Sequence, residues 1–129
     1  MTKSKYPILV VEDNKITRQI FTQIVSGELP EVEFDEACNL EDMFDKLRGK
    51  RYDLIFFDLG MCRGDYNYDS LRRAQNTNES MIVLGMSGFG KEYFDRMEEK
   101  PPVEEILASK STEDIVASIR KYLAIEGEV

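Results

Sequence analysis

Short apolar runs alternate along the chain with stretches in which apolar residues recur at the spacing of a helix. Five runs have the length of a strand, and they lie at residues 6–11, 32–37, 53–57, 81–87 and 103–109. Each is followed by a stretch typical of a helix, and these lie at residues 15–26, 40–48, 68–75, 89–99 and 111–123. Strands that alternate with helices form a parallel sheet covered on both faces. The pattern therefore predicts one α/β domain with a doubly wound parallel sheet of five strands and five helices.

The expected helices carry packing signals and end signals. The first helix is expected to face the sheet through four apolar residues at helical spacing: Ile16, Ile20, Ile24 and Val25. Gly27 stands where this helix would end. Asn39 precedes the second helix as an N-cap. Ser111 with Asp114 gives the last helix a start that is similar to a capping box.

Composition indicates the broad class of the protein. With 129 residues, of which 42% are hydrophobic and 33% charged, the chain is expected to form one soluble domain. Its apolar runs are much shorter than the roughly 18 residues typical of a membrane span. The first run is interrupted by an acid at Glu12, so the N-terminus does not have the form of a signal peptide. We expect a cytoplasmic protein that does not contact the membrane.

Charge and residue usage argue against several functions. The net charge of −8 and the dispersed Lys and Arg residues argue against direct binding of nucleic acid, which needs clustered positive charge. The chain has no histidine, so it has no Ser-His-Asp or Cys-His relay, no histidine-rich zinc site and no phosphohistidine of its own. Cys38 and Cys62 form no CxxC pair, which favours a reducing compartment.

Residues capable of chemistry stand at the ends of four expected strands. These residues are Glu12 and Asp13 after the first strand, Asp58 after the third, Ser87 at the end of the fourth and Lys110 after the fifth. In an open parallel sheet, sites form beyond the carboxyl ends of the strands. We therefore expect these side chains to gather around one crevice.

The chemistry of this set points to a phosphoryl group and a metal ion. Three clustered carboxylates repel one another unless a proton or a cation joins them, and oxygen ligands without histidine favour Mg²⁺. A carboxylate beside this ion can attack a phosphoryl group, while a lysine and a hydroxyl hold the remaining phosphoryl oxygens. Taken singly, each residue also reads as a turn former, a helix cap, a loop residue or a surface charge. Their joint placement favours a functional site.

Four motifs lie in order along the chain: ILVVEDN at 8–14, YDLIFFDLGM at 52–61, IVLGMSG at 82–88 and ILASKS at 106–111. Together they resemble the receiver domain of response regulators in two-component signalling. The resemblance covers nearly the whole chain. It implies a flavodoxin-like fold with strand order 2-1-3-4-5, a receiver domain at residues 1–129 and a folded core at about residues 6–125.

The resemblance implies how a phosphoryl group would be handled. Asp58 would accept it from the phosphohistidine of a sensor histidine kinase or a histidine phosphotransfer protein. Ser87 would move to donate a hydrogen bond to the phosphoryl group, and Lys110 would pair with it. The chain would then be a phosphoacceptor regulator that catalyses only its own phosphorylation and dephosphorylation, and not an enzyme that acts on other substrates.

The resemblance also implies a site for Mg²⁺ as the cofactor. Asp13 and Asp58 would bind the ion directly, and the backbone carbonyl of Gly60 would supply another ligand. Glu12 would act through a bound water.

The chain departs from the usual pattern of the family in parts associated with switching. Cys62 stands where proline is usual, and RGDYNYD at 63–69 replaces the usual Asp-Gly turn. Ser111 follows the lysine where proline is usual, and Leu107 replaces the aromatic switch residue. Signalling therefore cannot depend on a Tyr or Phe that swings inward at position 107.

Three functions remain as alternatives. The first is a phosphoacceptor switch that a downstream protein or a covalently linked output domain reads through the surface of the fourth helix, fifth strand and fifth helix, where FGKEYFDRM at 89–97 carries three aromatic residues. The second is a degenerate receiver that binds its partner independently of phosphorylation. The third is a phosphohydrolase, but that class needs a second carboxylate two residues after the nucleophile, where this chain has Gly60.

Overall fold

A five-stranded parallel sheet forms the centre of the protein, whose computed structural model describes residues 5–62, 68–87 and 100–125. The strands are β1 (Tyr6–Val11), β2 (Val32–Ala37), β3 (Leu54–Asp58), β4 (Ile82–Met86) and β5 (Glu105–Ile106). Their order in the sheet is β2-β1-β3-β4-β5, and every neighbouring pair is parallel. The predicted fold class and strand order are confirmed.

Four helices among the described residues connect and cover the strands. The first consists of three consecutive pieces, which are α1 (Lys15–Gln19), the π-helix η1 (Ile20–Val25) and α2 (Ser26–Glu28). The others are α3 (Leu40–Gly49), α4 (Asp69–Thr77) and α6 (Thr112–Leu123), and a 3-10 turn, η2 (Leu59–Cys62), follows β3. The helix predicted at 89–99 lies outside the described residues.

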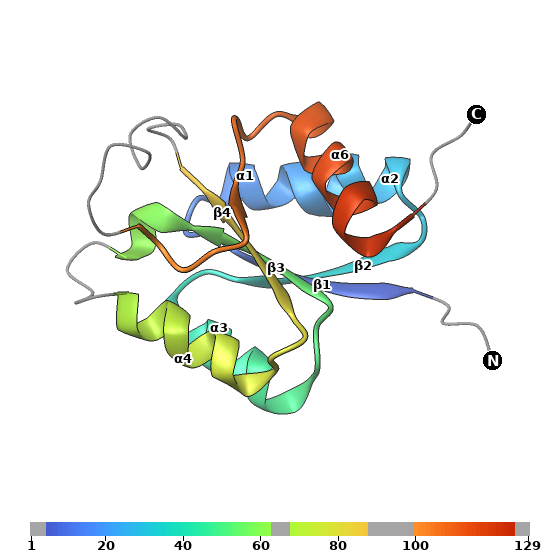
Figure 1. Ribbon diagram of the computed structural model, residues 1–129. Coiled ribbons are helices and arrows are strands. Elements are labelled where there is room, and N and C mark those ends of the chain that lie inside the picture. The colour runs from blue at the N-terminus through green and yellow to red at the C-terminus, as the bar shows by residue number, and fades with distance from the viewer. Residues whose placement is uncertain (1–4, 63–67, 88–99, 126–129) are drawn as a thin grey trace.

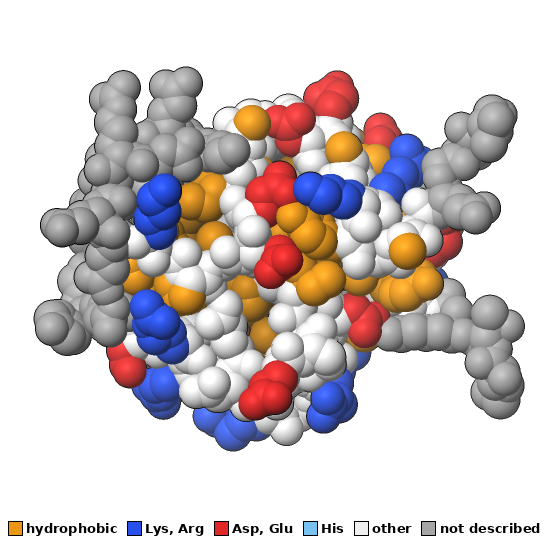
Figure 2. All heavy atoms as spheres, in the orientation of Figure 1, with side chains coloured by type: hydrophobic (Ala, Val, Ile, Leu, Met, Phe, Trp, Pro, Cys, Tyr) orange, Lys and Arg blue, Asp and Glu red, His pale blue; other side chains and the backbone are white. Residues whose placement is uncertain are grey.

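The helices form one layer on each face of the sheet. Figure 1 shows α1, α2 and α6 on one side of the sheet and α3 and α4 on the other. Successive strand residues point to opposite faces, so Ile8 and Val10 pack under the first layer while Leu9 and Val11 pack under the second. On the face drawn in Figure 2, acidic and basic side chains of the described residues are interspersed.

The predicted stripe of the first helix is correct at Val25, which is buried, and at Ile20, which packs against the core, but wrong at Ile16 and Ile24. Ile16 is 72% exposed and Ile24 is 49% exposed, whereas Phe21 and Val25 are fully buried. The hydrogen bonds of a π-helix span five residues and shift the phase of the side chains, so a stripe drawn at uniform spacing does not describe the buried face. The helix also continues through Gly27 and does not end there.

Two of the predicted helix starts are confirmed by their capping bonds. The side chain of Asn39 accepts a hydrogen bond from the backbone N–H of Asp42 at 2.7 Å. The hydroxyl of Ser111 accepts one from the backbone N–H of Asp114 at 3.2 Å. Strand β5 has two residues and is much shorter than the predicted run at 103–109.

A polar cluster anchors the start of β3 to the edge strand β2. The Tyr52 hydroxyl donates a hydrogen bond to Asp35 Oδ2 at 2.6 Å, and Lys50 Nζ lies 3.1 Å from the same oxygen. Burial and the hydrogen bond to Asp35 raise the pKa of the Tyr52 hydroxyl. Burial opposes the charge of Asp35, but the hydrogen bonds from Tyr52 and Lys50 outweigh it and lower the pKa of Asp35.

The Tyr52→Phe variant is expected to lose about 1–2 kcal/mol of unfolding free energy at pH 7, because the Asp35 carboxylate loses a hydrogen-bond donor. This loss should shrink above pH 10. Folding raises the pKa of the Tyr52 hydroxyl, so the hydroxyl contributes fully to the unfolding free energy below its unfolded pKa of 10.0. This contribution is lost as the pH rises towards the pKa of the folded state. The phenylalanine side chain does not titrate, so the variant lacks this decline of unfolding free energy at high pH. Urea unfolding of both proteins at pH 7 and above pH 10 measures the difference, and a difference independent of pH would contradict the assignment.

Candidate functional site

Three carboxylates meet at the carboxyl ends of β1 and β3, as predicted. Glu12 and Asp13 follow β1 directly, and Asp58 is the last residue of β3. One oxygen of each side chain lies within 4.8 Å of the other two. Glu12 is 1% exposed and Asp58 is 8% exposed, whereas Asp13 is exposed. Like charges this close repel one another, so positive charge nearby stabilises the cluster.

Strand pairing and helix capping hold the cluster in place. Val11 of β1 lies beside Phe57 of β3, so the residues that follow them, Glu12 and Asp58, are neighbours. The first helix is capped by Asn14, whose side chain accepts a hydrogen bond from the backbone N–H of Thr17 at 3.1 Å. Within Glu12-Asp13-Asn14 the capping residue is therefore Asn14, while Glu12 and Asp13 gather with Asp58.

Glu12 uses both carboxylate oxygens in bonds within the protein. Its Oε2 accepts a hydrogen bond from the backbone N–H of Asn14 at 3.2 Å, and its Oε1 accepts one from Lys110 Nζ at 2.8 Å. The distance from Lys110 Nζ to Asp58 Oδ1 is longer, at 3.9 Å. Sequence reasoning placed Lys110 at the site but did not identify this pairing. A carboxylate as buried as Glu12 needs such a partner, because an unpaired buried charge costs several kcal/mol.

The backbone after Asp58 fits closely around its side chain. The N–H of Gly60 donates a hydrogen bond to Asp58 Oδ1 at 3.0 Å, and a Cβ atom at Gly60 would lie 3.3 Å from the same oxygen. Leu59 is buried against β4, where a Cβ atom on Gly85 would come within 2.8 Å of its Cδ1. Glycine at position 85 therefore allows the residue next to Asp58 to pack against the sheet.

Ser87 lies at the same edge of the sheet. Asp58 is the register partner of Met86 in β4, and Ser87 is the next residue. Ser87 is 7% exposed, so its hydroxyl lies in a largely buried position. The six residues predicted for the site thus come from strand ends and loops at one edge of the sheet.

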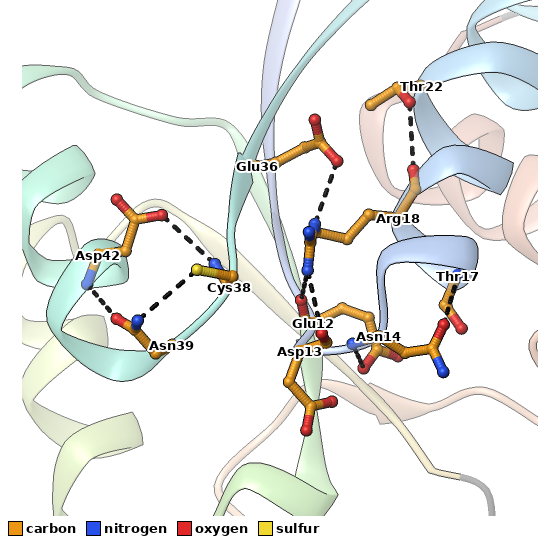
Figure 3. A network of polar contacts seen from close by, with 10 residues as sticks. All are labelled: Glu12, Asp13, Asn14, Thr17, Arg18, Thr22, Glu36, Cys38, Asn39 and Asp42. Carbon is orange, nitrogen blue, oxygen red and sulfur yellow. Dashed lines mark hydrogen bonds and ion pairs between the residues drawn. The ribbon is translucent and has the colours of Figure 1, made fainter.

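Sequence reasoning missed Arg18, which holds the turn that carries the acidic pair. Its Nη1 donates to the backbone carbonyl of Glu12 at 2.7 Å and to that of Asp13 at 3.2 Å. Its Nε donates to Glu36 Oε1 at 3.2 Å. Figure 3 shows the side chain reaching from the first helix across to this turn and to β2. The available signal was its place five residues after Asp13, where a helical side chain can reach back to the preceding turn.

The donor atoms of the acidic cluster fit a hard divalent cation. Glu12, Asp13 and Asp58 offer oxygen atoms only, which is the ligand chemistry of Mg²⁺. Mg²⁺ typically takes one or two carboxylates and keeps several waters. Since Glu12 is engaged by Lys110 and by the N–H of Asn14, the carboxylates of Asp13 and Asp58 fit a direct contact with the ion better.

The sequence profile of the response regulator receiver domain matches residues 8–120. The chain belongs to this family. Receiver domains are switches in two-component signalling and not classical enzymes, which accords with a site of carboxylates, a lysine and a hydroxyl. No helix in the described parts of this receiver domain is long and apolar enough to cross a membrane.

Known proteins similar to this receiver domain support the assignment. The sensory transduction protein LytT of Bacillus subtilis (strain 168) is 20% identical over 122 residues, which cover 95% of this chain and 50% of LytT. The chain thus spans about half the length of this relative. The crystal structure of the response regulator TrrA from Thermotoga maritima in complex with Mg(2+)-BeF has 20% identity and a TM-score of 0.73, covering 91% of this chain and 98% of that one.

A third similar protein comes from the crystal structure of the P1 domain of CheA3 in complex with CheY6 from R. sphaeroides. The matching chain has 21% identity and a TM-score of 0.71, and the match covers 95% of this chain and 99% of that one. At these identities the two solved structures show the fold, which is the flavodoxin-like receiver fold.

Two residues that depart from the usual receiver pattern, Leu107 and Ser111, lie among the described residues. Leu107 is 4% exposed and belongs to the core with Ile115 and Ile119 of α6, so it already occupies an inward position. Ser111 caps α6. Residues 63–67 and the aromatic residues at 89–97 lie outside the described residues.

Proposed function

We propose that this receiver domain is a Mg²⁺-dependent phosphoacceptor switch in which Asp58 accepts a phosphoryl group from a partner's phosphohistidine. The observation that carries this proposal is the position of Asp58, a nearly buried carboxylate beside two further acids and 3.9 Å from an ammonium group. An Asp58 oxygen attacks phosphorus while the bond from phosphorus to the imidazole nitrogen breaks. The products are an acyl phosphate and an imidazole that takes up a proton.

The proposed roles of the surrounding residues are those that the resemblance to receiver domains implies. Asp13, Asp58 and the backbone carbonyl of Gly60 would hold Mg²⁺, and Glu12 would act through a bound water. When bound, the ion neutralises charge on the phosphoryl oxygens. The N–H of Gly60 orients the Asp58 carboxylate through its 3.0 Å hydrogen bond.

Two further side chains hold the transferred group. Lys110 leaves Glu12 and pairs with the phosphoryl group, and the Ser87 hydroxyl donates a hydrogen bond to it. These contacts exist only in the phosphorylated form, so they shift an equilibrium between two conformations of the domain. Because Leu107 is already buried, this switch does not use an inward movement of the side chain at that position.

The proposed phosphodonor is a sensor histidine kinase or a histidine phosphotransfer protein. Two observations support it: the chain has no histidine, and a protein of the same fold is seen with the P1 domain of CheA3. On the receiver domain, the large exposed hydrophobic residues Ile16 and Ile24 lie on the helical segment that begins beside Asp13. We propose that they form part of the surface that receives the donor.

The Ile16→Glu variant is expected to accept a phosphoryl group about tenfold more slowly from a phosphohistidine domain that phosphorylates the wild type. The reason is that a charge replaces an apolar contact with that domain. Its phosphorylation by acetyl phosphate should remain at the wild-type rate, since Ile16 is not part of the site. Parallel time courses with the two donors measure the difference. Asn76→Glu, which adds the same charge on α4, is the control. Equal slowing with both donors would contradict a docking role.

The domain is proposed to occupy residues 1–129, with a folded core at about residues 6–125. Its output is proposed to pass to a downstream protein or a covalently linked output domain through the surface that includes β5 and α6. A phosphorylation-independent interaction module remains the second candidate, favoured by Leu107 and Ser111 at positions where receivers usually carry an aromatic residue and proline.

Incubation with acetyl phosphate, followed by intact mass measurement, tests the proposed function. The wild-type protein is expected to gain a single phosphoryl group with Mg²⁺ present and none with excess chelator. The adduct should be removed by hydroxylamine, which cleaves acyl phosphates. A folded protein that neither binds Mg²⁺ nor gains the adduct would favour the interaction module. Continuing release of phosphate at enzyme-like rates would favour a phosphohydrolase.

A further inference from the structure

One guanidinium group holds the backbone of the acidic turn, and the chemistry proposed above does not use it. Arg18 Nη1 lies 2.7 Å from the carbonyl oxygen of Glu12 and 3.2 Å from that of Asp13, while Nε lies 3.2 Å from Glu36 Oε1. The Arg18 side chain is 16% exposed, against 43% for that of Glu36. The first helix is thereby connected to the turn after β1 and to the edge strand β2.

The position of these carbonyl groups explains why a guanidinium is needed. Glu12 and Asp13 lie just beyond the last residue of β1, where the strand ladder ends and carbonyl groups need other donors. Arginine presents several N–H donors in one rigid plane. The same group can therefore bind both carbonyls from Nη1 and the Glu36 carboxylate from Nε. Lysine is a point donor on a flexible stem and cannot fix all three acceptors at once.

We infer that Arg18 is a positioning residue for the divalent cation, because it fixes the backbone from which the Glu12 and Asp13 carboxylates project. This inference rests on the proposed Mg²⁺-dependent function. Figure 3 shows the Asp13 carboxylate pointing away from Arg18 while the guanidinium contacts the backbone behind it. Arg18 thus acts on the turn and leaves the oxygens of Asp13 available to the ion.

The charge of Arg18 and its contacts with the turn predict opposite effects of its removal on Mg²⁺ affinity. A nearby positive charge repels a divalent cation, so by charge alone the loss of Arg18 would strengthen Mg²⁺ binding. Groups that orient metal ligands typically contribute about 10–100-fold in affinity, so by position the loss would weaken binding. The charge of Arg18 is already balanced by Glu36. We therefore expect the positional effect to prevail.

Calorimetric titration of the whole chain with Mg²⁺ tests this inference. Arg18→Met removes the donors and the charge but keeps an unbranched side chain of similar helix propensity, and it is expected to weaken Mg²⁺ binding by about tenfold or more. Arg18→Lys should recover part of the affinity, because an ammonium can still reach one carbonyl. Arg48→Met makes the same change in an exposed residue of α3, and its affinity should equal that of the wild type.

A second readout separates positioning from a general loss of structure. Thermal unfolding without Mg²⁺ measures the contribution of Arg18 to stability, whereas the dissociation constant is measured on folded protein. A purely structural role would lower the unfolding temperature and leave the Mg²⁺ affinity unchanged. A folded Arg18→Met variant that binds Mg²⁺ as tightly as the wild type, or more tightly, would overturn the inference.

The test remains decisive if Arg18→Met does not fold. In that case a severalfold weaker Mg²⁺ affinity of Arg18→Lys supports the inference, and a wild-type affinity overturns it. Failure of the proposed function looks different, because the wild-type protein itself would then bind no Mg²⁺ and accept no phosphoryl group from acetyl phosphate.

Discussion

Replacing Asp58 with Asn is expected to abolish the phosphoryl adduct completely while leaving the protein folded. An amide oxygen does not attack phosphorus as a carboxylate does, and the nearby acids Glu12 and Asp13 do not substitute for it. Glu12 is held by Lys110 and the N–H of Asn14. The unfolding free energy should rise and not fall, because the substitution removes one of three clustered like charges. Intact mass measurement after incubation with acetyl phosphate and Mg²⁺ gives the first result, and urea unfolding gives the second.

The matched control for this substitution is Asp45→Asn, which makes the same chemical change in an exposed residue of α3 that pairs with Arg48. The Asp45→Asn variant should be phosphorylated by acetyl phosphate at the wild-type rate. An adduct of wild-type abundance on Asp58→Asn would place the phosphoacceptor elsewhere.

Replacing Lys110 with Met is expected to slow phosphorylation by acetyl phosphate about 100-fold, because removing a charged group that stabilises the transition state typically has an effect of this size. The ammonium lies 3.9 Å from Asp58 Oδ1, close to where charge develops on the phosphoryl oxygens. The same substitution should tighten Mg²⁺ binding by roughly tenfold, since it removes one positive charge and releases Glu12. The 27% exposure of the Lys110 side chain limits this gain through solvent screening.

Phosphorylation time courses and calorimetric titrations with Mg²⁺ measure these two opposite effects. Lys46→Met is the control, because Lys46 pairs with Asp42 on α3, and neither residue belongs to the site. Wild-type phosphorylation of the Lys110→Met variant would contradict the role of the ammonium. Weaker Mg²⁺ binding would show that the Glu12–Lys110 pair supports the metal site and does not compete with it.

The strands themselves and the gathering of the site residues were predictable because they depend on short-range patterns and one topological rule. Buried runs precede Glu12 and Asp58, and parallel strands bring their carboxyl ends to one edge of the sheet. The resemblance to receiver domains added the strand order, since a set of strands and helices alone is compatible with several orders.

The phase of the first helix was not predictable because it depends on contacts distant in sequence. Phe21 packs against Phe34 of β2 and Phe56 of β3, with ring centroids 5.8 Å and 4.9 Å apart. These contacts are made by a helix with a π-helical turn, and periodicity counted at uniform spacing selected Ile16 and Ile24 instead. The interpretation was wrong at the two positions that are exposed.

The sequence also does not show which groups Lys110 and Arg18 contact in the fold. Lys110 lies near both Glu12 and Asp58, and the choice between them depends on which carboxylate is more buried in the finished fold. Arg18 binds backbone carbonyls, which are present at every residue, so its place after the acidic pair shows that it can reach them but not that it does.

The pair formed by Glu12 and Lys110 also bears on the order in which the protein assembles. The two residues are 98 positions apart, so nearly the whole domain must be synthesised before they meet. Contacts of such separation form late, because the intervening chain must first be ordered. Until the segment after β5 docks, the Glu12 carboxylate lacks the ammonium that compensates its burial. The candidate site is therefore incomplete until residue 110 has been synthesised and has reached Glu12.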